Sequence, residues 1–104
     1  MNFVRDFKEI TQTIEEQPLT LLYVSQPHCS VCHSVLPQVR EVLKDYPKVK
    51  GIHADASETP AVSGAYLVFT VPVIILFSKG KELHRQARFI QLDKLIRQLN
   101  ILTE

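Results

Sequence analysis

The sequence has few of the residues on which several classes of protein depend. It contains no tryptophan, one methionine, three glycines and two cysteines in 104 residues. Twelve lysines and arginines stand against eleven aspartates and glutamates, so no surplus of positive charge is available to neutralise a nucleic-acid backbone. No repeat, linker or low-complexity segment divides the chain. We therefore expect a single domain over residues 1–104 that acts as a monomer and does not bind nucleic acid.

Segments that would direct the chain into a membrane or out of the cell are also lacking. The N-terminal segment 1–17 carries charges from Arg5 onward and cannot supply the apolar core of a signal peptide. The longest apolar run, residues 67–77, is interrupted by Thr70 and Pro72 and is too short to cross a bilayer. We therefore expect a soluble cytoplasmic protein. In a reducing compartment, two closely spaced cysteines are more often catalytic or metal-binding than a structural crosslink.

The spacing of apolar residues predicts four helices. The first has Asn2 as a candidate N-cap, ends at Pro18 and presents one apolar face, made of Phe3, Phe7, Ile10 and Ile14. The second starts at the cysteines and contains Pro37, where a missing backbone donor predicts a kink; its apolar stripe consists of Val31, Val35, Val39 and Val42. Residues 57–66 predict a short helix with Ser57 as a candidate cap, and residues 92–102 predict a last amphipathic helix.

Strand patterns alternate with these helices. Residues 19–25, 49–56 and 72–77 are short, largely apolar runs, and residues 82–88 follow a turn as the return strand of a hairpin. Strands that alternate with helices favour parallel pairing through right-handed crossovers, whereas the hairpin adds an antiparallel edge. The sequence therefore predicts an α/β fold in which a central mixed sheet is flanked by helices.

The two cysteines, Cys29 and Cys32, are separated by two residues and flanked by His28 and His33. The run from Cys29 to His33 matches the haem attachment pattern, but no export signal is visible and the only methionine is Met1. Structural zinc usually takes two ligand pairs separated by a loop, whereas these four side chains fall within six residues. Both interpretations are disfavoured, and we expect neither a metal nor a bound cofactor.

A redox dithiol fits the surrounding pattern better. A pair that follows a strand and opens a helix places Cys29 at the helix N-terminus, where unpaired N–H groups and the helix dipole favour a thiolate. Cys32 stands one helical turn further on, close enough to close a disulfide ring. Two unreactive cysteines at the edge of a core remain the alternative.

The order of these helices, strands and cysteines resembles that of the thioredoxin family over nearly the whole length of the sequence. The cysteine pair stands where that family keeps its redox motif, Pro37 matches its helix-kinking proline, Val71-Pro72 looks like its cis-proline dipeptide, and residues 77–83 are similar to its hairpin. The resemblance implies a thioredoxin fold, Cys29 as nucleophile, Cys32 as resolving thiol, and binding of an extended client by Val71 beside Pro72. It also implies disulfide-containing client proteins, no cofactor, and a reductase or low-molecular-weight thiol as electron donor.

The sequence departs from the family pattern around the dithiol. His28 and Ser25 replace two aromatic residues, Tyr23 replaces a buried acid, and Gly51 replaces its lysine partner. Arg88, followed by Phe89, replaces the glycine of the client groove, and the first strand is expected to be short or missing.

Because an imidazole titrates near neutral pH, His28 and His33 are candidate modulators of the thiols, together with Tyr23. For His53 and His84 on the predicted strands, an ordinary structural role is favoured. Two alternatives to an enzyme stay open: a redox-inactive binding module and a redox sensor.

Overall fold

The computed structural model describes all of residues 1–104 and contains five strands and four helices. In chain order they are β1 (Asn2–Phe3), α1 (Phe7–Glu16), β2 (Thr20–Ser25), α2 (Ser30–Leu43), β3 (Lys50–Asp55), α3 (Ala61–Ala65), β4 (Val73–Ser78), β5 (Lys81–Ala87) and α4 (Leu92–Leu102). The predicted alternation of helices and strands is confirmed. The first strand, which was expected to be short or missing, is present with two residues.

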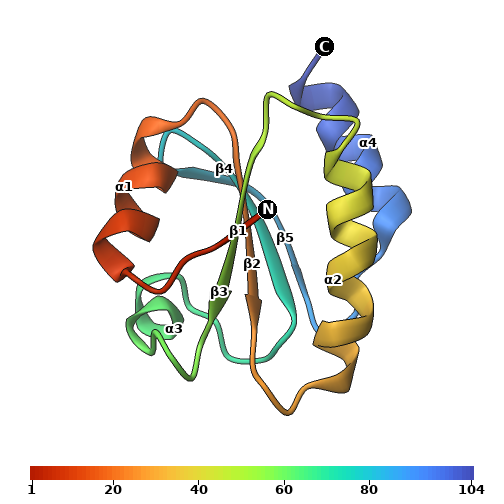
Figure 1. Cartoon of the computed structure of the whole chain (residues 1–104). Coiled ribbons are helices and arrows are strands. Elements are labelled where there is room, and N and C mark those ends of the chain that lie inside the picture. The colour runs from red at the N-terminus through yellow and green to blue at the C-terminus, as the bar shows by residue number, and fades with distance from the viewer.

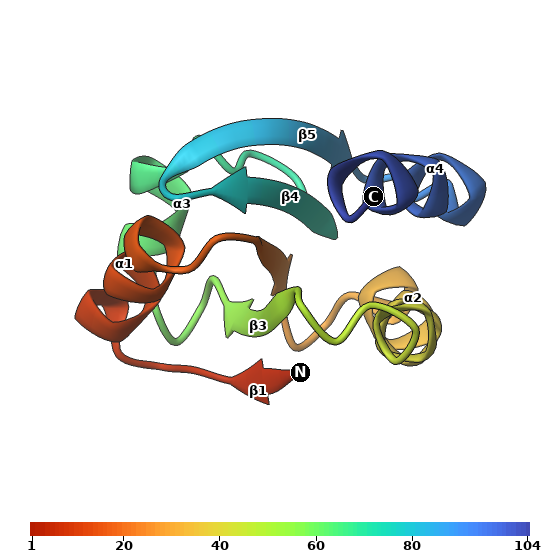
Figure 2. The same ribbon diagram turned by 90° about the horizontal axis from the view of Figure 1, so that it is seen from above.

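The five strands form one mixed sheet in the order β1-β3-β2-β4-β5. Strands β1, β3 and β2 are parallel, whereas β4 runs antiparallel to both β2 and β5. Helices α1 and α3 cover one face of the sheet, and α2 and α4 cover the other (Figures 1 and 2). This arrangement is the thioredoxin fold that the sequence predicted.

Each face of the sheet carries its own apolar core, and β2 contributes to both. Its alternate residues Leu22 and Val24 pack toward α1, whereas Leu21 and Tyr23 pack toward α2 and α4. All six residues of β2 are buried. A central strand covered on both faces excludes water from its whole length, which explains the continuous apolar run in its sequence. The loop that follows β2 is therefore held at a fixed place at the carboxyl end of this central strand.

The first helix begins later than predicted. Asp6 is its N-cap and accepts a hydrogen bond from the Lys8 N–H, and the helix starts at Phe7. The assignment of Asn2 as the cap was wrong, because Asn2 pairs with Ile52 and Phe3 pairs with His53 in the sheet. A tertiary contact with β3 decides this segment, and helical periodicity cannot reveal such a contact.

The short third helix also has a different start. Its N-cap is Pro60, while the Ser57 hydroxyl and N–H both donate to the carboxylate of Asp55. Ser57 therefore stabilises the turn after β3 and does not cap α3.

The predicted apolar stripe of α2 needs one correction. Val31, its first residue, is 51% exposed, whereas Val39 is fully buried.

None of the helices combines the length and the apolar character that crossing a membrane requires.

Candidate active site

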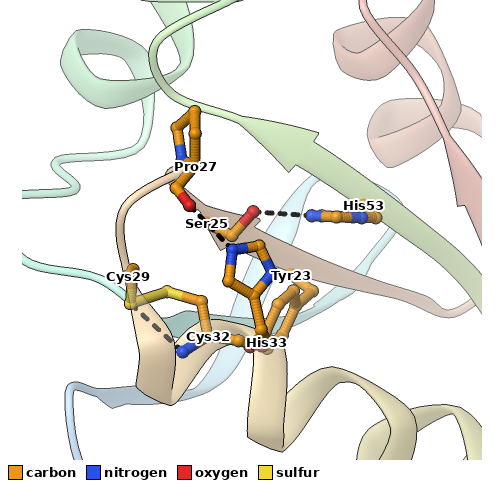
Figure 3. Close-up of a disulfide and its surroundings, with 7 residues drawn as sticks. All are labelled: Tyr23, Ser25, Pro27, Cys29, Cys32, His33 and His53. Atoms are coloured by element: carbon orange, nitrogen blue, oxygen red, sulfur yellow. Dashed lines mark hydrogen bonds between the residues drawn. A yellow bond between two sulfur atoms is a disulfide. The ribbon is translucent and has the colours of Figure 1, made fainter.

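The two cysteines lie where β2 ends and α2 begins. Cys29 is the N-cap of α2, with extended backbone angles, and is joined to Cys32 by a disulfide (Figure 3). Their Cα atoms are 5.2 Å apart, and the Cys32 N–H donates to the Cys29 Sγ at 3.1 Å. An N–H group of the first helical turn thus already points at the sulfur that would carry negative charge after reduction. The sequence-based placement of Cys29 at the helix N-terminus is confirmed.

The two sulfurs differ in their access to solvent. Cys29 is partly exposed, whereas Cys32 is 1% exposed and lies under the first turn of α2. An incoming reactant can reach Cys29 from outside, but it can reach Cys32 only through Cys29. The geometry therefore distinguishes an outer sulfur from an inner one.

His28 and His33 lie on the outside of the site. His28 is exposed and lines the same surface groove as Cys29. His33 is exposed on α2, and its ring Nε2 donates to the carbonyl oxygen of Pro27 at 2.8 Å (Figure 3). The His33 ring thereby ties the start of α2 to the loop that precedes it.

Tyr23 occupies the interior position behind the dithiol. It is fully buried on β2, and its hydroxyl donates to the carbonyl oxygen of Cys32 at 2.6 Å. Burial raises the pKa of Tyr23 to about 12. Tyr23 is therefore neutral at physiological pH, and its hydroxyl supports the backbone of Cys32.

Gly51, on the neighbouring strand β3, is closely covered by apolar side chains. A Cβ atom at this position would lie 2.9 Å from the Leu43 Cδ1 and 3.2 Å from the Met1 Cγ. Apolar side chains from α2 and from the N-terminus thus fill the volume above Gly51. The interior behind the cysteines contains neither a carboxylate at position 23 nor an ammonium group at position 51.

A polar pair that the sequence patterns did not reveal lies beside Tyr23. Ser25 Oγ is hydrogen-bonded to His53 Nε2 at 2.6 Å, and Ser25 is buried. The His53 ring packs edge-on against Tyr23 (Figure 3), with ring centroids 5.5 Å apart. It also packs edge-on against Phe3, with ring centroids 4.9 Å apart. The period of two along neighbouring parallel strands could have signalled this contact, since Tyr23, Ser25 and His53 share one face. His53 therefore belongs to the group of side chains around Tyr23, behind the dithiol, and does not line the groove.

The environment of His53 disfavours its charged form. Burial is the largest cause that lowers its pKa, followed by the positive charge of Arg40. The charge of Asp55 raises this pKa, and His33 lowers it further. The net direction is downward, so that the ring stays neutral at neutral pH.

His84, the other histidine on a strand, has a similar but separate environment. Its ring nitrogen is within hydrogen-bond distance of the Gln86 side chain, and burial followed by the charge of Lys94 lowers its pKa. It does not line the groove beside Cys29.

Val71 lies across the groove from the cysteines. A depression of about 370 Å³ is lined by His28, Cys29, Ser30, Val31, Val71, Arg88 and Phe89. The Val71–Pro72 peptide bond is cis, and neither the N–H nor the C=O of Val71 has a hydrogen-bond partner in the chain. The structure thus brings Val71 together with Cys29, while Pro72 is buried directly behind it.

The chain contains no group of three or more histidine, cysteine, aspartate or glutamate side chains arranged to hold a metal ion.

We predict that His53 makes the protein less stable in acid. Its native pKa lies below the ordinary value near 6.5, so that between these two values the unfolded chain binds more protons. The free energy of unfolding therefore falls as the pH drops through this window. In His53→Asn, the loss of stability between about pH 8 and about pH 5 should be smaller than in the parent protein. Urea unfolding at the two pH values measures it.

The same change removes the partner of Ser25, so the variant should be less stable by about 1 kcal/mol at pH 8. His28→Asn at an exposed position serves as the matched control and should retain the acid sensitivity of the parent. An equal loss of stability in His53→Asn and in the parent protein would contradict the prediction.

Comparison with known proteins connects this geometry to a family. The sequence matches the Thioredoxin family over residues 3–100. It is 39% identical to the Thioredoxin-like protein YdfQ of Bacillus subtilis over 99 residues, which cover 95% of this chain and 88% of that protein. A thioredoxin of Rickettsia bellii is 29% identical over 73 residues, covering 69% of this chain and 70% of the relative.

Solved structures agree in fold. The thioredoxin of Plasmodium falciparum superposes with a TM-score of 0.87 at 20% identity, covering 94% of this chain and 98% of the other. The thioredoxin of Fasciola hepatica gives a TM-score of 0.83 at 19% identity, covering 99% and 100% of the two chains. At these identities the likeness shows the fold alone. Together with the matched residues 3–100 and the Cys29–Cys32 pair, it establishes that the chain belongs to the thioredoxin family of thiol–disulfide oxidoreductases.

Proposed function

We propose that the protein reduces disulfides in other proteins through the Cys29–Cys32 dithiol. The observation that carries this proposal is the difference in access between the two sulfurs. Cys29 is partly exposed in a groove, and its sulfur accepts a hydrogen bond from an N–H of α2. Cys32 is buried one helical turn behind it. Such an arrangement supports a nucleophile and a resolving thiol, in that order.

The reaction transfers two electrons in two exchanges. The Cys29 thiolate attacks one sulfur of the client disulfide, a new S–S bond forms, and the other client sulfur leaves as a thiolate. Cys32 then loses its proton to solvent and attacks the Cys29 sulfur, which releases the first client sulfur as a second thiolate. The client is reduced to a dithiol and the protein is oxidised to the Cys29–Cys32 disulfide.

The client would bind as an extended segment along the groove. The unpaired N–H and C=O of Val71 can pair with the client backbone as one added strand, and Pro72 holds Val71 beside Cys29. Backbone pairing does not depend on the client's side chains, so this contact accommodates many sequences. Selectivity then has to come from the other residues that line the groove.

We further propose that His28 or His33 influences the protonation of Cys29. His28 lines the groove with Cys29, and His33 lies on the first turn of α2. A protonated imidazole in either place would favour the thiolate electrostatically. Tyr23 would act on the thiols through its hydrogen bond to the Cys32 carbonyl, because burial raises its pKa to about 12 and keeps it uncharged.

The setting we propose is the cytoplasm, where reducing conditions let a dithiol act repeatedly. The protein would work as a monomer without a bound cofactor. A reductase or a low-molecular-weight thiol would return the disulfide to the dithiol, in keeping with the reductase partners that thioredoxin-family proteins use.

Trapping tests whether proteins are the clients. In Cys32→Ser the first exchange proceeds but the second cannot, so that mixed disulfides with client proteins should accumulate at Cys29. Non-reducing gels and mass spectrometry of the captured species measure this. Cys29→Ser is the matched control and should trap at least tenfold less, since Cys32 is buried. Partners captured equally well by a variant that lacks both cysteines would point to a redox-inactive binding module.

The midpoint potential of the dithiol tests the direction of the chemistry. A reductant of this family should equilibrate near about −270 mV, whereas a value above about −200 mV would favour oxidation or isomerisation of clients. Equilibration in graded thiol and disulfide buffers, followed by counting of free thiols by mass, gives the value. A couple that shows no reversible two-electron transition would contradict the proposed activity.

The pH profile of Cys29 alkylation tests the histidines. We expect His28→Ala or His33→Ala to move the midpoint of that profile toward higher pH, because a neighbouring positive charge is lost. The size of the shift should be a few tenths of a pH unit to about one unit at these exposed positions. Unchanged profiles in both variants would remove the histidines from the proposal.

A further inference from the structure

The groove beside Cys29 has one permanent charge, and that charge is positive. Its lining contains Arg88 and no aspartate or glutamate. The three ion pairs of the chain join Arg5 to Glu58, Lys44 to Glu41 and Arg85 to Glu82, so that Arg88 takes part in none of them. Its side chain makes no hydrogen bond either; its guanidinium carbon lies 5.4 Å from the centre of the Phe89 ring. The groove thus presents a cation without an anionic partner.

The backbone holds Arg88 in this place. Its N–H donates to the carbonyl oxygen of Pro72 at 2.7 Å, and the preceding residue, Ala87, pairs with Val73 across the β4–β5 ladder. The φ angle of Arg88 is +68°, in the left-handed region that favours glycine. A long cationic side chain is therefore kept at a position where its backbone conformation is unfavourable, which points to a contribution outside the folding of the chain.

Two exposed apolar side chains share the groove lining with this charge. Phe89 is 75% exposed next to Arg88, and Val31 is 51% exposed on the first turn of α2. Exposed apolar side chains next to an unpaired cation complement a segment that carries a carboxylate beside an apolar residue. Because Cys29 lies in the same lining, the carboxylate would belong to a residue next to the reacting cysteine of the client.

We propose that Arg88 selects acidic clients: extended protein segments in which a glutamate or aspartate adjoins the disulfide cysteine. This inference rests on the proposed reduction of protein disulfides and names the substrate class of the same site. Arg88 acts by attracting the client carboxylate, while Val31 and Phe89 contact the neighbouring apolar side chain.

Three peptide disulfides test the role of charge. They differ only in the residue next to the cysteine, which is glutamate, glutamine or lysine. The second-order rate constant for reduction by the reduced protein is measured for each and divided by the rate with dithiothreitol, which removes the intrinsic reactivity of the peptide. At low salt we expect the glutamate peptide to react about 3-fold to 10-fold faster than the glutamine peptide, with the lysine peptide slowest. Added salt should reduce the difference.

Variants then assign the preference to one residue. Arg88→Gln should react with all three peptides at nearly the same rate, and Arg88→Lys should retain the order. Arg88→Gly, which suits the left-handed backbone, removes the charge without backbone strain and should also lose the preference. Lys48→Gln makes the same change of charge near the start of β3, away from the groove, and should behave like the parent protein.

The outcomes separate this inference from the function on which it rests. Equal rates for the three peptides, or a preference that persists in Arg88→Gln, would overturn the selection by charge and leave the reductase standing. Failure to reduce any peptide would overturn both. A carboxylate preference that is seen with oxidised glutathione against its ethyl ester, but not with the peptides, would replace protein clients by an anionic low-molecular-weight disulfide.

Discussion

The fixed junction between β2 and α2 is the constraint on which the site depends. β2 is buried on both faces, so its last residue has one position, and α2 must start within the few residues that follow. Cys29 is the residue at which extended backbone changes to helical backbone. Its sulfur is therefore placed at the unpaired N–H groups of the helix by the packing of the sheet, without any special local motif. The same helical turn buries Cys32 behind it.

The interior behind this junction is polar but uncharged at neutral pH. Tyr23 donates to the Cys32 carbonyl, and Ser25 is paired with His53. A buried carboxylate at position 23 would need a cationic partner, and the side chains of Leu43 and Met1 fill the space above Gly51 where such a partner would stand. A hydrogen-bonded tyrosine at position 23 and a glycine under apolar side chains at position 51 leave no uncompensated buried charge. The two departures at positions 23 and 51 thus form one consistent change.

The local parts of this structure could be predicted from the sequence, whereas contacts between distant segments could not. The start of α2 at Cys29 and the buried strand before it follow from patterns within a few residues. The two-residue strand β1 exists because Phe3 pairs with His53, and the Ser25–His53 bond joins residues that are 28 positions apart. Val31 has the spacing of a core residue but lies on the first turn of α2, where it faces the groove instead of the sheet. Periodicity reports which side of a helix a residue occupies, and it does not report where the covering layer ends.

The distribution of charge around Cys29 follows from these same departures. With a neutral interior, the groups that can favour the thiolate are the N-terminus of α2 and the side chains on the groove surface, among them His28 and Arg88. The helix end acts through a direct N–H contact and depends little on the solvent, whereas exposed cations are screened by salt over about 10 Å. In the proposed reaction, the helix end and the surface cations both favour the Cys29 thiolate, and added salt weakens only the contribution of the surface. The choice among charged clients depends on the surface charges alone, so salt weakens this choice more than it weakens the reactivity of Cys29 toward small neutral reagents.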